Sequence, residues 1–318
     1  MKIVITGSSG HLGEALVRRF LERGANVVGI DVLPSPQTHV VGSILDRSLV
    51  DQLLKSADVV LHAATLHKPH VATHSKQQFI DVNVTGTQIL LDAAVKHRVG
   101  TFIFTSTTST FGQAMSPSRD EAVWVTEDLV PVPKNIYGVT KIAAEDLCQL
   151  ASQEHGLPCI VLKTSRFFPE EDDMSHAMPE FSQDNLKAIE FLNRRVDIED
   201  VVSAHERAIE RATEIRFDKF IITATTPFTP KDCRDLLKDA PAVLKNYYPD
   251  YEDIFAHRGW KMFSKLGRVY VNRHAREKLG WEPKYNFGEI LRRLERNENV
   301  LSNLALQIGI KGYHPRLL

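Results

Sequence analysis

Tyr137 and Lys141, in the segment "YGVTK", are the side chains with the clearest chemical use in this 318-residue chain. Four residues make about one helical turn, so both side chains lie on one face of the helix predicted over 137–154. A free phenol, with a pKa of about 10, is a poor base near neutrality, but a nearby ammonium lowers that pKa. A tyrosine tuned in this way can take a proton from an alcohol as hydride leaves, or return it to a carbonyl.

A histidine-rich stretch, "HAATLHKPHVATH", is a second candidate for chemistry. It places four histidines within 13 residues, His62, His67, His70 and His74. His70 and His74 are four apart, a spacing used by helical zinc sites. No Cys, Asp or Glu joins them between Asp58 and Asp81. Proton exchange by a tyrosine needs no metal, so we expect no metal site here.

A glycine-rich turn, "TGSSGHLG" at residues 6–13, follows the first predicted strand and opens the first predicted helix. Its GxxGxxG spacing suits a dinucleotide loop, in which the backbone approaches a pyrophosphate and helix amides face negative charge. Asp31 ends the second predicted strand, where a carboxylate can accept hydrogen bonds from the adenosine ribose. No Arg or Lys follows it in "DVLPSP", which favours NAD over NADP. A tight strand-to-helix turn and a solvated carboxylate are the non-functional alternatives.

Short apolar segments, rich in Val, Ile and Phe, alternate with helical patterns through the first half of the chain. The predicted strands are 2–6, 26–31, 58–64, 101–106 and 159–164, with a further strand at 219–224. The helical patterns lie near 12–23, 47–56, 76–97 and 137–154. Because the strands lack apolar–polar alternation, we expect them to be buried on both faces. The pattern predicts an α/β fold with a doubly wound parallel sheet of the Rossmann type.

The pattern changes after Thr164. Residues 169–183 are acidic and contain two prolines, which predicts a loop, and helices are expected near 184–193 and 198–213. Further on, one helix should end at Gly280, where a left-handed cap is favourable, and another should begin near Gly288. We predict an NAD-binding Rossmann domain over 1–168 and 194–226. Residues 169–193 and 227–318 are then a smaller substrate-binding domain at the carboxyl edge of the sheet.

Composition limits the class of protein. A chain with 43% hydrophobic residues can bury a large core, and its net charge of −1 gives no indication of a nucleic-acid or membrane partner. The three cysteines are widely spaced without a CxxC pair, which fits a reducing compartment. The opening "MKIVITG" is typical of a buried strand rather than a secretion signal, and no apolar run approaches roughly 20 residues. We expect a soluble, cytoplasmic protein.

The ordered set of motifs resembles the extended short-chain dehydrogenase/reductase family, and within it the nucleotide-sugar epimerases and dehydratases. The set comprises TGxxGxxG, Asp31, "HAA" at 62–64, "DVNVTGT", "TSTTS" and YxxxK. It covers residues 1–168 closely and 196–204 and 278–285 more loosely. The resemblance implies that Tyr137 is the acid/base and that Lys141 lowers its pKa and contacts the nicotinamide ribose. Thr107 would bond the reacting oxygen, with Ser106 as the alternative after a one-residue shift.

The resemblance also implies the cofactor and substrate contacts. The implied NAD contacts, beside Tyr137 and Lys141, are Gly7, Ser9, Gly10, His11, Leu12, Gly13, Asp31, Ile44, Ala63, Ala64, Asn83, Thr105 and Phe167. The implied substrate contacts are Thr65, His67, Thr108 and Arg166. His67 falls on a loop that lies over the nicotinamide end in this family, and we expect the other three histidines to be structural or solvated. The helices near 84–98 and 137–154 resemble a dimerising pair, so a homodimer is expected.

Two departures from the family pattern narrow the reaction. In dehydratases and decarboxylases the two positions after the catalytic Thr usually carry acids, but here they are Thr108 and Ser109. Loss of water or carbon dioxide is therefore not expected, which leaves hydride transfer or 4-epimerisation. The segment from Phe168 to Val196 is also short and has no glycine, so the usual clamp on a nucleoside diphosphate is reduced or absent. This favours a substrate smaller than a nucleotide sugar.

The third departure is Arg166, which stands where many of these epimerases have an Asn. A guanidinium suits paired hydrogen bonds to a carboxylate or phosphate, so an anionic substrate is expected. The alternative is an internal salt bridge with nearby acids, namely Glu170, Glu171, Asp172 or Asp173. The predicted function is hydride transfer between NAD and a small polyhydroxylated or sugar-acid alcohol or ketone. The alternatives are a UDP-hexose 4-epimerase working through a transient 4-ketone and an NAD sensor without chemistry, which the intact Tyr, Lys and Thr set disfavours.

Overall fold

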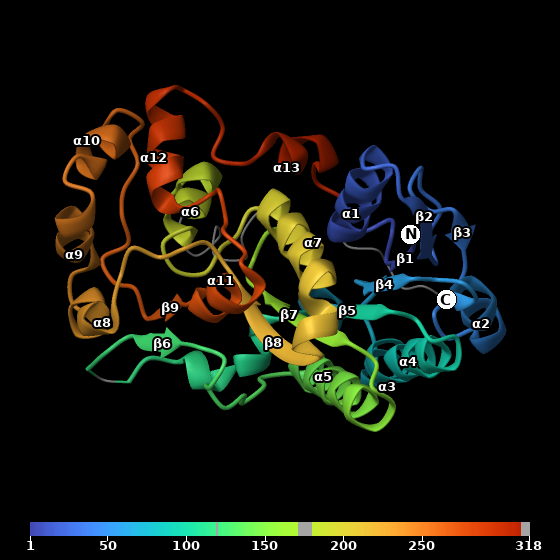
Figure 1. The fold of residues 1–318 in the computed structure, drawn as a ribbon. Coiled ribbons are helices and arrows are strands. Elements are labelled where there is room, and N and C mark those ends of the chain that lie inside the picture. The colour runs from blue at the N-terminus through green and yellow to red at the C-terminus, as the bar shows by residue number, and fades with distance from the viewer. Residues whose placement is uncertain (119, 171–179, 313–318) are drawn as a thin grey trace.

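A parallel sheet forms the centre of the computed structural model, which describes residues 1–118, 120–170 and 180–312 (Figure 1). Its seven strands run in the order β3-β2-β1-β4-β5-β7-β8. In that order they are Val40–Val41, Asn26–Asp31, Lys2–Thr6, Val59–His62, Thr101–Thr107, Cys159–Thr164 and Phe217–Ile222. The chain adds β2 and β3 on one side of β1 and then crosses back to add β4 on the other side. The predicted doubly wound fold is therefore confirmed, with the order reversing between β1 and β4.

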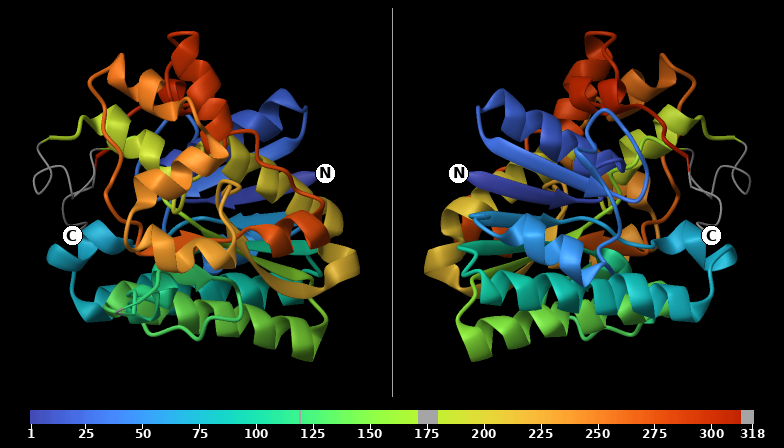
Figure 2. Two further views of the ribbon diagram at one scale, coloured as in Figure 1. Left: turned by 90° about the vertical axis from the view of Figure 1, so that its left-hand side faces the viewer. Right: turned by 90° about the vertical axis from the view of Figure 1, so that its right-hand side faces the viewer.

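Helices cover both faces of this sheet (Figure 2). One face carries α1 (His11–Glu22) and α7 (Ile198–Ile215), and the other carries α2 (Arg47–Leu54), α4 (Gly86–Lys96) and α5 (Ile136–His155). Successive residues of β1 point to opposite faces, so Ile3 and Ile5 join one apolar cluster while Val4 joins the other. Because both faces are buried, apolar residues occur on both faces of the central strands instead of alternating with polar ones.

The helix predicted over 76–97 is interrupted. It consists of α3 (Lys76–Ile80), a π-helical turn over Asp81–Thr85 and then α4. Asn83 lies in the π-helical turn and is buried, and its amide makes hydrogen bonds to the backbone N–H and carbonyl of Leu66 at 2.8 and 2.9 Å. It also donates to Thr140 Oγ1 on α5 at 3.1 Å. The wide turn thus ties the loop after β4 to α5, a use typical of π-bulges near functional sites.

A second, two-stranded parallel sheet pairs β6 (Val123–Val125) with β9 (Arg268–Tyr270), and the sequence did not indicate it. Three-residue strands from distant parts of the chain are too short to show a period. The remaining helices are α6 (Gln183–Glu190), α8 (Cys233–Leu236), α9 (Ala240–Tyr247), α10 (Tyr251–Ala256), α11 (Arg273–Leu279), α12 (Phe287–Glu295) and α13 (Asn303–Ile308). Short 3₁₀ turns cover Lys68–Ala72, Thr108–Phe111, Gln113–Met115 and Pro230–Asp232. Gly280 follows α11 with φ +63°, so the predicted left-handed cap is confirmed.

The C-terminal helices share one continuous apolar cluster with the sheet. Trp281, Phe287 and Ile308 belong to the same buried apolar cluster as Ile3. The division into a Rossmann domain and a substrate domain therefore stays a prediction. Residues 171–179 of the predicted loop, and 313–318 of the predicted substrate domain, lie outside the described residues.

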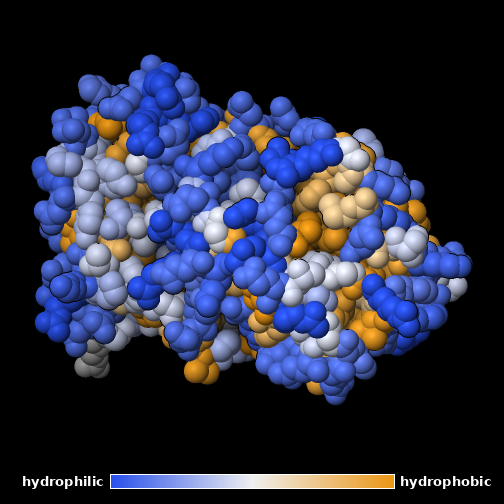
Figure 3. Space-filling model, viewed as in Figure 1, coloured by the Kyte–Doolittle hydropathy of each residue, from blue (hydrophilic) through white to orange (hydrophobic). Residues whose placement is uncertain are grey.

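The surface carries no extended apolar band on the face shown in Figure 3, where hydrophilic residues predominate and hydrophobic ones lie in small groups. Within the described ranges, no helix combines the length and the apolar character that a membrane crossing requires. Cys148, Cys159 and Cys233 are all buried and unpaired.

Candidate active site

A cavity of about 440 Å³ opens at the carboxyl ends of β1, β2, β4, β5 and β7, where the strand order reverses. Ligands of open α/β sheets bind at this edge. The predicted site residues that line it are Gly7, Ser9, Gly10, His11, Leu12, Gly13, Asp31, Ile44, Ala63, Ala64, Thr65, His67, Thr105, Ser106, Thr107, Thr108, Tyr137, Arg166 and Phe167. Two predicted residues, Asn83 and Lys141, are buried behind the lining.

The glycine turn can close only because its glycines have no side chains. A Cβ on Gly13 would lie 1.9 Å from the Gly7 carbonyl oxygen, and one on Gly7 would lie 2.7 Å from the Ala64 nitrogen. Gly7 also has φ +76°, which L side chains rarely adopt. The turn delivers the chain into α1 at His11, where the first amides of the helix have no partner within the helix. The backbone thus forms a cradle suited to a pyrophosphate.

Asp31 joins the glycine turn to the end of β2. Its two carboxylate oxygens accept hydrogen bonds from the Ser9 and Leu33 backbone N–H groups, each at 3.0 Å. An ionised carboxylate has about four acceptor positions, so capacity remains for ribose hydroxyls. The following residues, Val32 and Leu33, line the same part of the cavity and bring no positive charge that could bind a 2′-phosphate.

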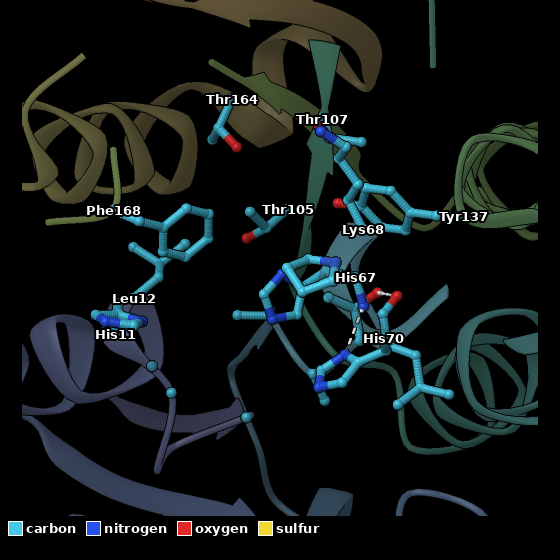
Figure 4. Close-up of a pocket in the computed structure, with 18 of the residues that line it drawn as sticks. His11, Leu12, His67, Lys68, His70, Thr105, Thr107, Tyr137, Thr164 and Phe168 are labelled. Carbon is cyan, nitrogen blue, oxygen red and sulfur yellow. Dashed lines mark hydrogen bonds between the residues drawn. The ribbon is translucent and has the colours of Figure 1, made fainter. Parts of the chain in front are cut away.

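Tyr137 and Thr107 meet at the end of β5, as Figure 4 shows. The N-terminus of α5 is fixed by Asn135, whose side chain accepts the Gly138 N–H at 3.1 Å, and this places Tyr137 in the first turn. Tyr137 is only 8% exposed, and burial raises its pKa to about 12, while a hydrogen bond from the Thr107 hydroxyl partly offsets this. In this state Tyr137 is a neutral phenol.

Lys141 lies behind Tyr137, one turn further along α5. Its Nζ donates to the Thr105 carbonyl oxygen at 2.7 Å and lies 4.0 Å from the centre of the Phe104 ring. Burial lowers the pKa of Lys141 to about 7, and the negative charge of Glu145 opposes this change. Burial therefore raises the pKa of Tyr137 and lowers that of Lys141, whereas the sequence predicted that the ammonium lowers the pKa of the tyrosine.

The hydroxyls of β5 point to different partners. Thr105 Oγ1 lies 2.9 Å from His205 Nε2 on α7, whereas Ser106 Oγ donates to Glu145 Oε1 on α5 at 2.5 Å. Only Thr107, at the end of the strand, reaches the Tyr137 hydroxyl. The geometry therefore favours Thr107 over Ser106 as the partner of Tyr137.

The histidine stretch divides into two parts. His62 is buried between Thr6 Oγ1 at 2.7 Å and Thr87 Oγ1 at 2.9 Å, and burial lowers its pKa to about 3, so it is neutral. The other three, His67, His70 and His74, line the cavity. His70 is buried rather than facing solvent, because its Nδ1 accepts the His67 backbone N–H at 3.0 Å. The residues that the structure describes contain no cluster of three potential metal ligands.

Arg166 lines the cavity beside a carboxylate that the sequence did not single out. Its Nε lies 3.9 Å from Glu190 Oε2, and its Nη2 donates to the backbone carbonyl of Glu170 at 3.5 Å. The remaining predicted partners, Glu171, Asp172 and Asp173, lie outside the described residues. Glu190 is almost fully buried and also binds Arg194 at 2.5 Å and Arg195 at 2.8 Å. Among the described residues, three guanidinium groups therefore share one carboxylate.

Comparison with known proteins identifies the family. Residues 3–222 match the model of the NAD dependent epimerase/dehydratase family. The chain belongs to this family. The family is NAD-dependent, and the glycine cradle and Asp31 of this chain fit that cofactor.

Relatives of this chain include proteins named as dehydratases and proteins named as epimerases. The chain is 34% identical over 185 residues to a dTDP-glucose 4,6-dehydratase of Streptomyces antibioticus, covering 52% of this chain and 53% of that protein. It is 26% identical to a UDP-glucose 4-epimerase of Rhizobium leguminosarum bv. trifolii, covering 91% and 95%. The chain spans between 39% and 62% of the length of four curated relatives that it matches.

The fold has a solved counterpart. A crystal structure of a short-chain dehydrogenase/reductase superfamily protein from Agrobacterium tumefaciens with bound NAD superposes with a TM-score of 0.66. It is 22% identical and the match covers 93% of this chain and 98% of that one. At this level of identity the likeness concerns the fold.

Several lining residues of this epimerase/dehydratase family member were not predicted. They include Phe168, Arg194, Arg268, Tyr270, Lys311 and Gly312. The Phe168 ring stacks on the His67 ring, with 5.7 Å between ring centres, and meets the His11 ring edge-on at 5.2 Å. It therefore lies between the loop after β4 and the glycine turn (Figure 4). The pair "FF" at 167–168 is the only signal that could have indicated it, since Phe167 was already a predicted contact.

Lys311 reaches the cavity from the C-terminal part of the chain. Its Nζ binds Glu14 Oε2 on α1 at 2.5 Å, and its backbone N–H donates to Glu170 Oε1 at 3.2 Å. The same Glu170 oxygen lies 2.5 Å from His11 Nε2 in the glycine turn. We call Lys311, Glu14, Glu170 and His11 the C-terminal clasp. Nothing in the local sequence around Lys311 indicates these partners, because Lys311 and Glu14 are 297 positions apart.

Proposed function

We propose that the chain transfers hydride reversibly between NAD and a small polyhydroxylated or sugar-acid alcohol or ketone, with Tyr137 exchanging the proton. The observation that carries this proposal is the contact between Tyr137 and Thr107 at the cavity wall, with Lys141 buried one turn behind. A phenol and a hydroxyl that meet at the cavity wall can hold one substrate oxygen between them. The arrangement suits proton transfer at a carbon that gains or loses hydride.

In the oxidation direction, Tyr137 Oη takes the proton of the substrate hydroxyl while Thr107 Oγ1 donates a hydrogen bond to the oxygen that becomes the carbonyl. NAD supplies the hydride acceptor and a positive charge when it is bound. When Lys141 is an ammonium, its positive charge lies one helical turn from Tyr137 and stabilises the phenolate form of Tyr137. In the reduction direction the same phenol returns the proton.

Thr108 and Ser109 support a simple redox reaction over an elimination. Thr108 Oγ1 donates to the Thr164 carbonyl oxygen at 3.4 Å, and neither side chain can act as a carboxylic acid or carboxylate. Loss of water from a sugar needs a second acid/base pair next to the ketone, and these two positions do not supply it.

The positive end of the cavity supports an anionic substrate. Arg166, Arg194 and Arg268 all line it, and the buried Glu190 is shared by Arg166, Arg194 and Arg195. A guanidinium at the cavity wall can donate paired hydrogen bonds to a carboxylate on the substrate. The short segment between Phe168 and Val196 is consistent with a substrate that lacks a nucleoside diphosphate.

A UDP-hexose 4-epimerase is the second candidate, and one observation favours it. The relative that aligns over 91% of this chain is a UDP-glucose 4-epimerase. In that reaction Tyr137 would remove and return the proton on the same oxygen, and NADH would not accumulate. Incubation with UDP-glucose or UDP-galactose, followed by chromatography of the sugars and absorbance at 340 nm, separates the two functions.

The decisive variant is Tyr137→Phe. It removes the hydroxyl and keeps the ring, so we expect unchanged NAD affinity and a loss of turnover of ~1,000-fold or more, the scale of a lost acid/base group. Turnover is measured on a panel of sugar acids, neutral polyols and UDP-hexoses. Retained activity in Tyr137→Phe would refute the assignment. Tight NAD binding by the native chain without turnover of any panel member would support the NAD sensor instead.

We further propose a cytoplasmic homodimer that associates through α4 and α5. Val139 and Leu150 on α5 are 49% and 46% exposed, so this helix presents large apolar side chains to solvent. The three unpaired, buried cysteines support a reducing compartment. Sedimentation of the native chain beside a Leu150→Glu variant tests the interface, and a monomeric native chain would refute it.

A further inference from the structure

A buried ion pair lies directly behind the Tyr137–Lys141 pair. Glu145 is on α5, one turn after Lys141 and two turns after Tyr137, and is only 1% exposed. Its carboxylate accepts two hydrogen bonds from Lys163 Nζ on β7, at 2.7 and 2.9 Å. It also accepts the Ser106 hydroxyl at 2.5 Å, which connects it to the strand that carries Thr107.

Burying two charges is costly, and such a pair is not by itself a sign of added stability. An apolar pair of similar size could fill the same space. Its position relative to Lys141 therefore matters more than its strength. Lys141 is itself buried, and its direct partners in the structure are the neutral Thr105 carbonyl and the Phe104 ring.

The other titratable groups around Lys141 come from four elements. They are Tyr137 and Cys148 on α5, His62 on β4, Lys163 on β7 and Lys219 on β8. Burial keeps His62 and Cys148 uncharged, since it lowers the pKa of His62 and raises that of Cys148. Lys219 is more exposed and lies 3.4 Å from both Glu145 and Asp146. The buried charges that act on Lys141 are thus Glu145 and Lys163.

We propose that Glu145 and Lys163 are positioning residues that set the protonation of the Tyr137–Lys141 pair. Glu145 holds Lys141 in its ammonium form, and Lys163 limits the strength of this effect while it fixes the Glu145 carboxylate. Ser106 links the same carboxylate to the β5 strand end. The proposal rests on the proposed function, in which Tyr137 exchanges a proton beside an ammonium.

The two charges have opposite and predictable effects on the pH dependence of turnover. In the active form, Tyr137 is a tyrosinate and Lys141 is an ammonium, so the pair has lost one of its two protons. This form exists between the pH at which the first proton is lost and the pH at which the second is lost. Turnover therefore has a bell-shaped dependence on pH. Removing a nearby negative charge favours proton loss, so both limbs move to lower pH. Removing a nearby positive charge has the opposite effect.

The test compares Glu145→Gln with the double variant Glu145→Gln/Lys163→Met, using the best substrate of the panel and saturating NAD. The amide keeps the shape and can still accept the Ser106 hydroxyl. We expect the profile of Glu145→Gln to move to lower pH by about one unit, the effect of one close charge in a buried site. We expect the double variant to return most of the way to the native profile, because both charges are gone.

The control is Glu154→Gln, a carboxylate on the same helix that is 57% exposed and should not move the profile. Thermal unfolding of each variant identifies a folding defect, and if Glu145→Gln alone is unfolded, a Lys163→Met variant should still move both limbs to higher pH. Lower turnover with an unmoved profile in Glu145→Gln would overturn the proposal, as would a double variant that shifts as far as the single. Activity retained by Tyr137→Phe would instead refute the proposed function.

Discussion

The two ends of the cavity are built in different ways. At the cofactor end the wall is mainly backbone, formed by the glycine turn and the strand ends, and the Asp31 carboxylate accepts the Ser9 N–H of that turn. At the other end the wall consists of side chains, among them Arg166, Arg194 and Phe168, which come from segments outside the glycine turn. The cofactor end therefore depends on steric fit, whereas the other end depends on charge.

Among the variants that separate the two ends of the cavity, Gly13→Ala should have the largest effect, because it breaks the cofactor end. The added methyl group would lie 1.9 Å from the Gly7 carbonyl oxygen, so the turn cannot keep its shape. We expect NAD affinity, measured by calorimetry, to fall by ~100-fold or more, as for a loss of about 3 kcal/mol. Gly24→Ala is the control, because its Cβ meets open space and its positive φ costs only about 1 kcal/mol of stability. Normal NAD affinity in Gly13→Ala would contradict the steric account.

Arg166→Ala should weaken substrate binding at the arginine-lined end of the cavity and leave NAD binding unchanged. If a substrate carboxylate binds there, loss of a charge-assisted hydrogen bond of about 1.5–3 kcal/mol raises KM by about 10- to 100-fold. We expect kcat and NAD affinity to stay within about twofold. The matched control is the corresponding neutral alcohol, whose KM should not change. An equal loss for acid and alcohol would mean that Arg166 serves the structure through Glu190.

Lys311→Ala should have the smallest effect, because it removes one partly buried ion pair from the C-terminal clasp. We expect NAD to dissociate about two to five times faster in stopped-flow fluorescence, as fits an interaction of up to ~1 kcal/mol. Lys311→Arg should restore the native rate. An unchanged rate in Lys311→Ala would separate the clasp from cofactor retention.

The clasp should also respond to acid. Burial raises the pKa of Glu14 and Glu170, but Lys311 and Arg18 outweigh this at Glu14, and His11 outweighs it at Glu170, so both pKa values lie below 4.5. Carboxylates with lowered pKa values stabilise the folded contact above their ordinary pKa. That contribution is lost as the pH falls through the lowered values. The native rate of NAD dissociation should therefore approach that of Lys311→Ala in this acid range.

Features that depend on local sequence were predicted, whereas features that depend on distant partners were not. The strands of the main sheet and the Gly280 cap follow from local patterns, and apart from the two-residue β3 they were predicted. The π-helical turn at 81–85 was missed, since it keeps a helical pattern while changing the direction of Asn83. β6 and β9 were missed because neither is a strand without the other. The sequence did not indicate Glu145, Glu190 and Lys311, because their partners are distant in sequence or are brought close only by the fold.

The C-terminal clasp can form only late in the synthesis of the described chain, because Lys311 is made long after Glu14. The glycine turn and α1 leave the ribosome before the strands from β2 to β8, and the sheet that supports them can form as those strands follow. Lys311 emerges 297 residues after Glu14, which at 5–20 residues per second is a delay of roughly 15–60 s. Throughout that interval the dinucleotide site lacks one wall. A nascent chain can therefore meet its cofactor before Lys311 has been synthesised, but the contacts of the clasp form only after Lys311 has emerged.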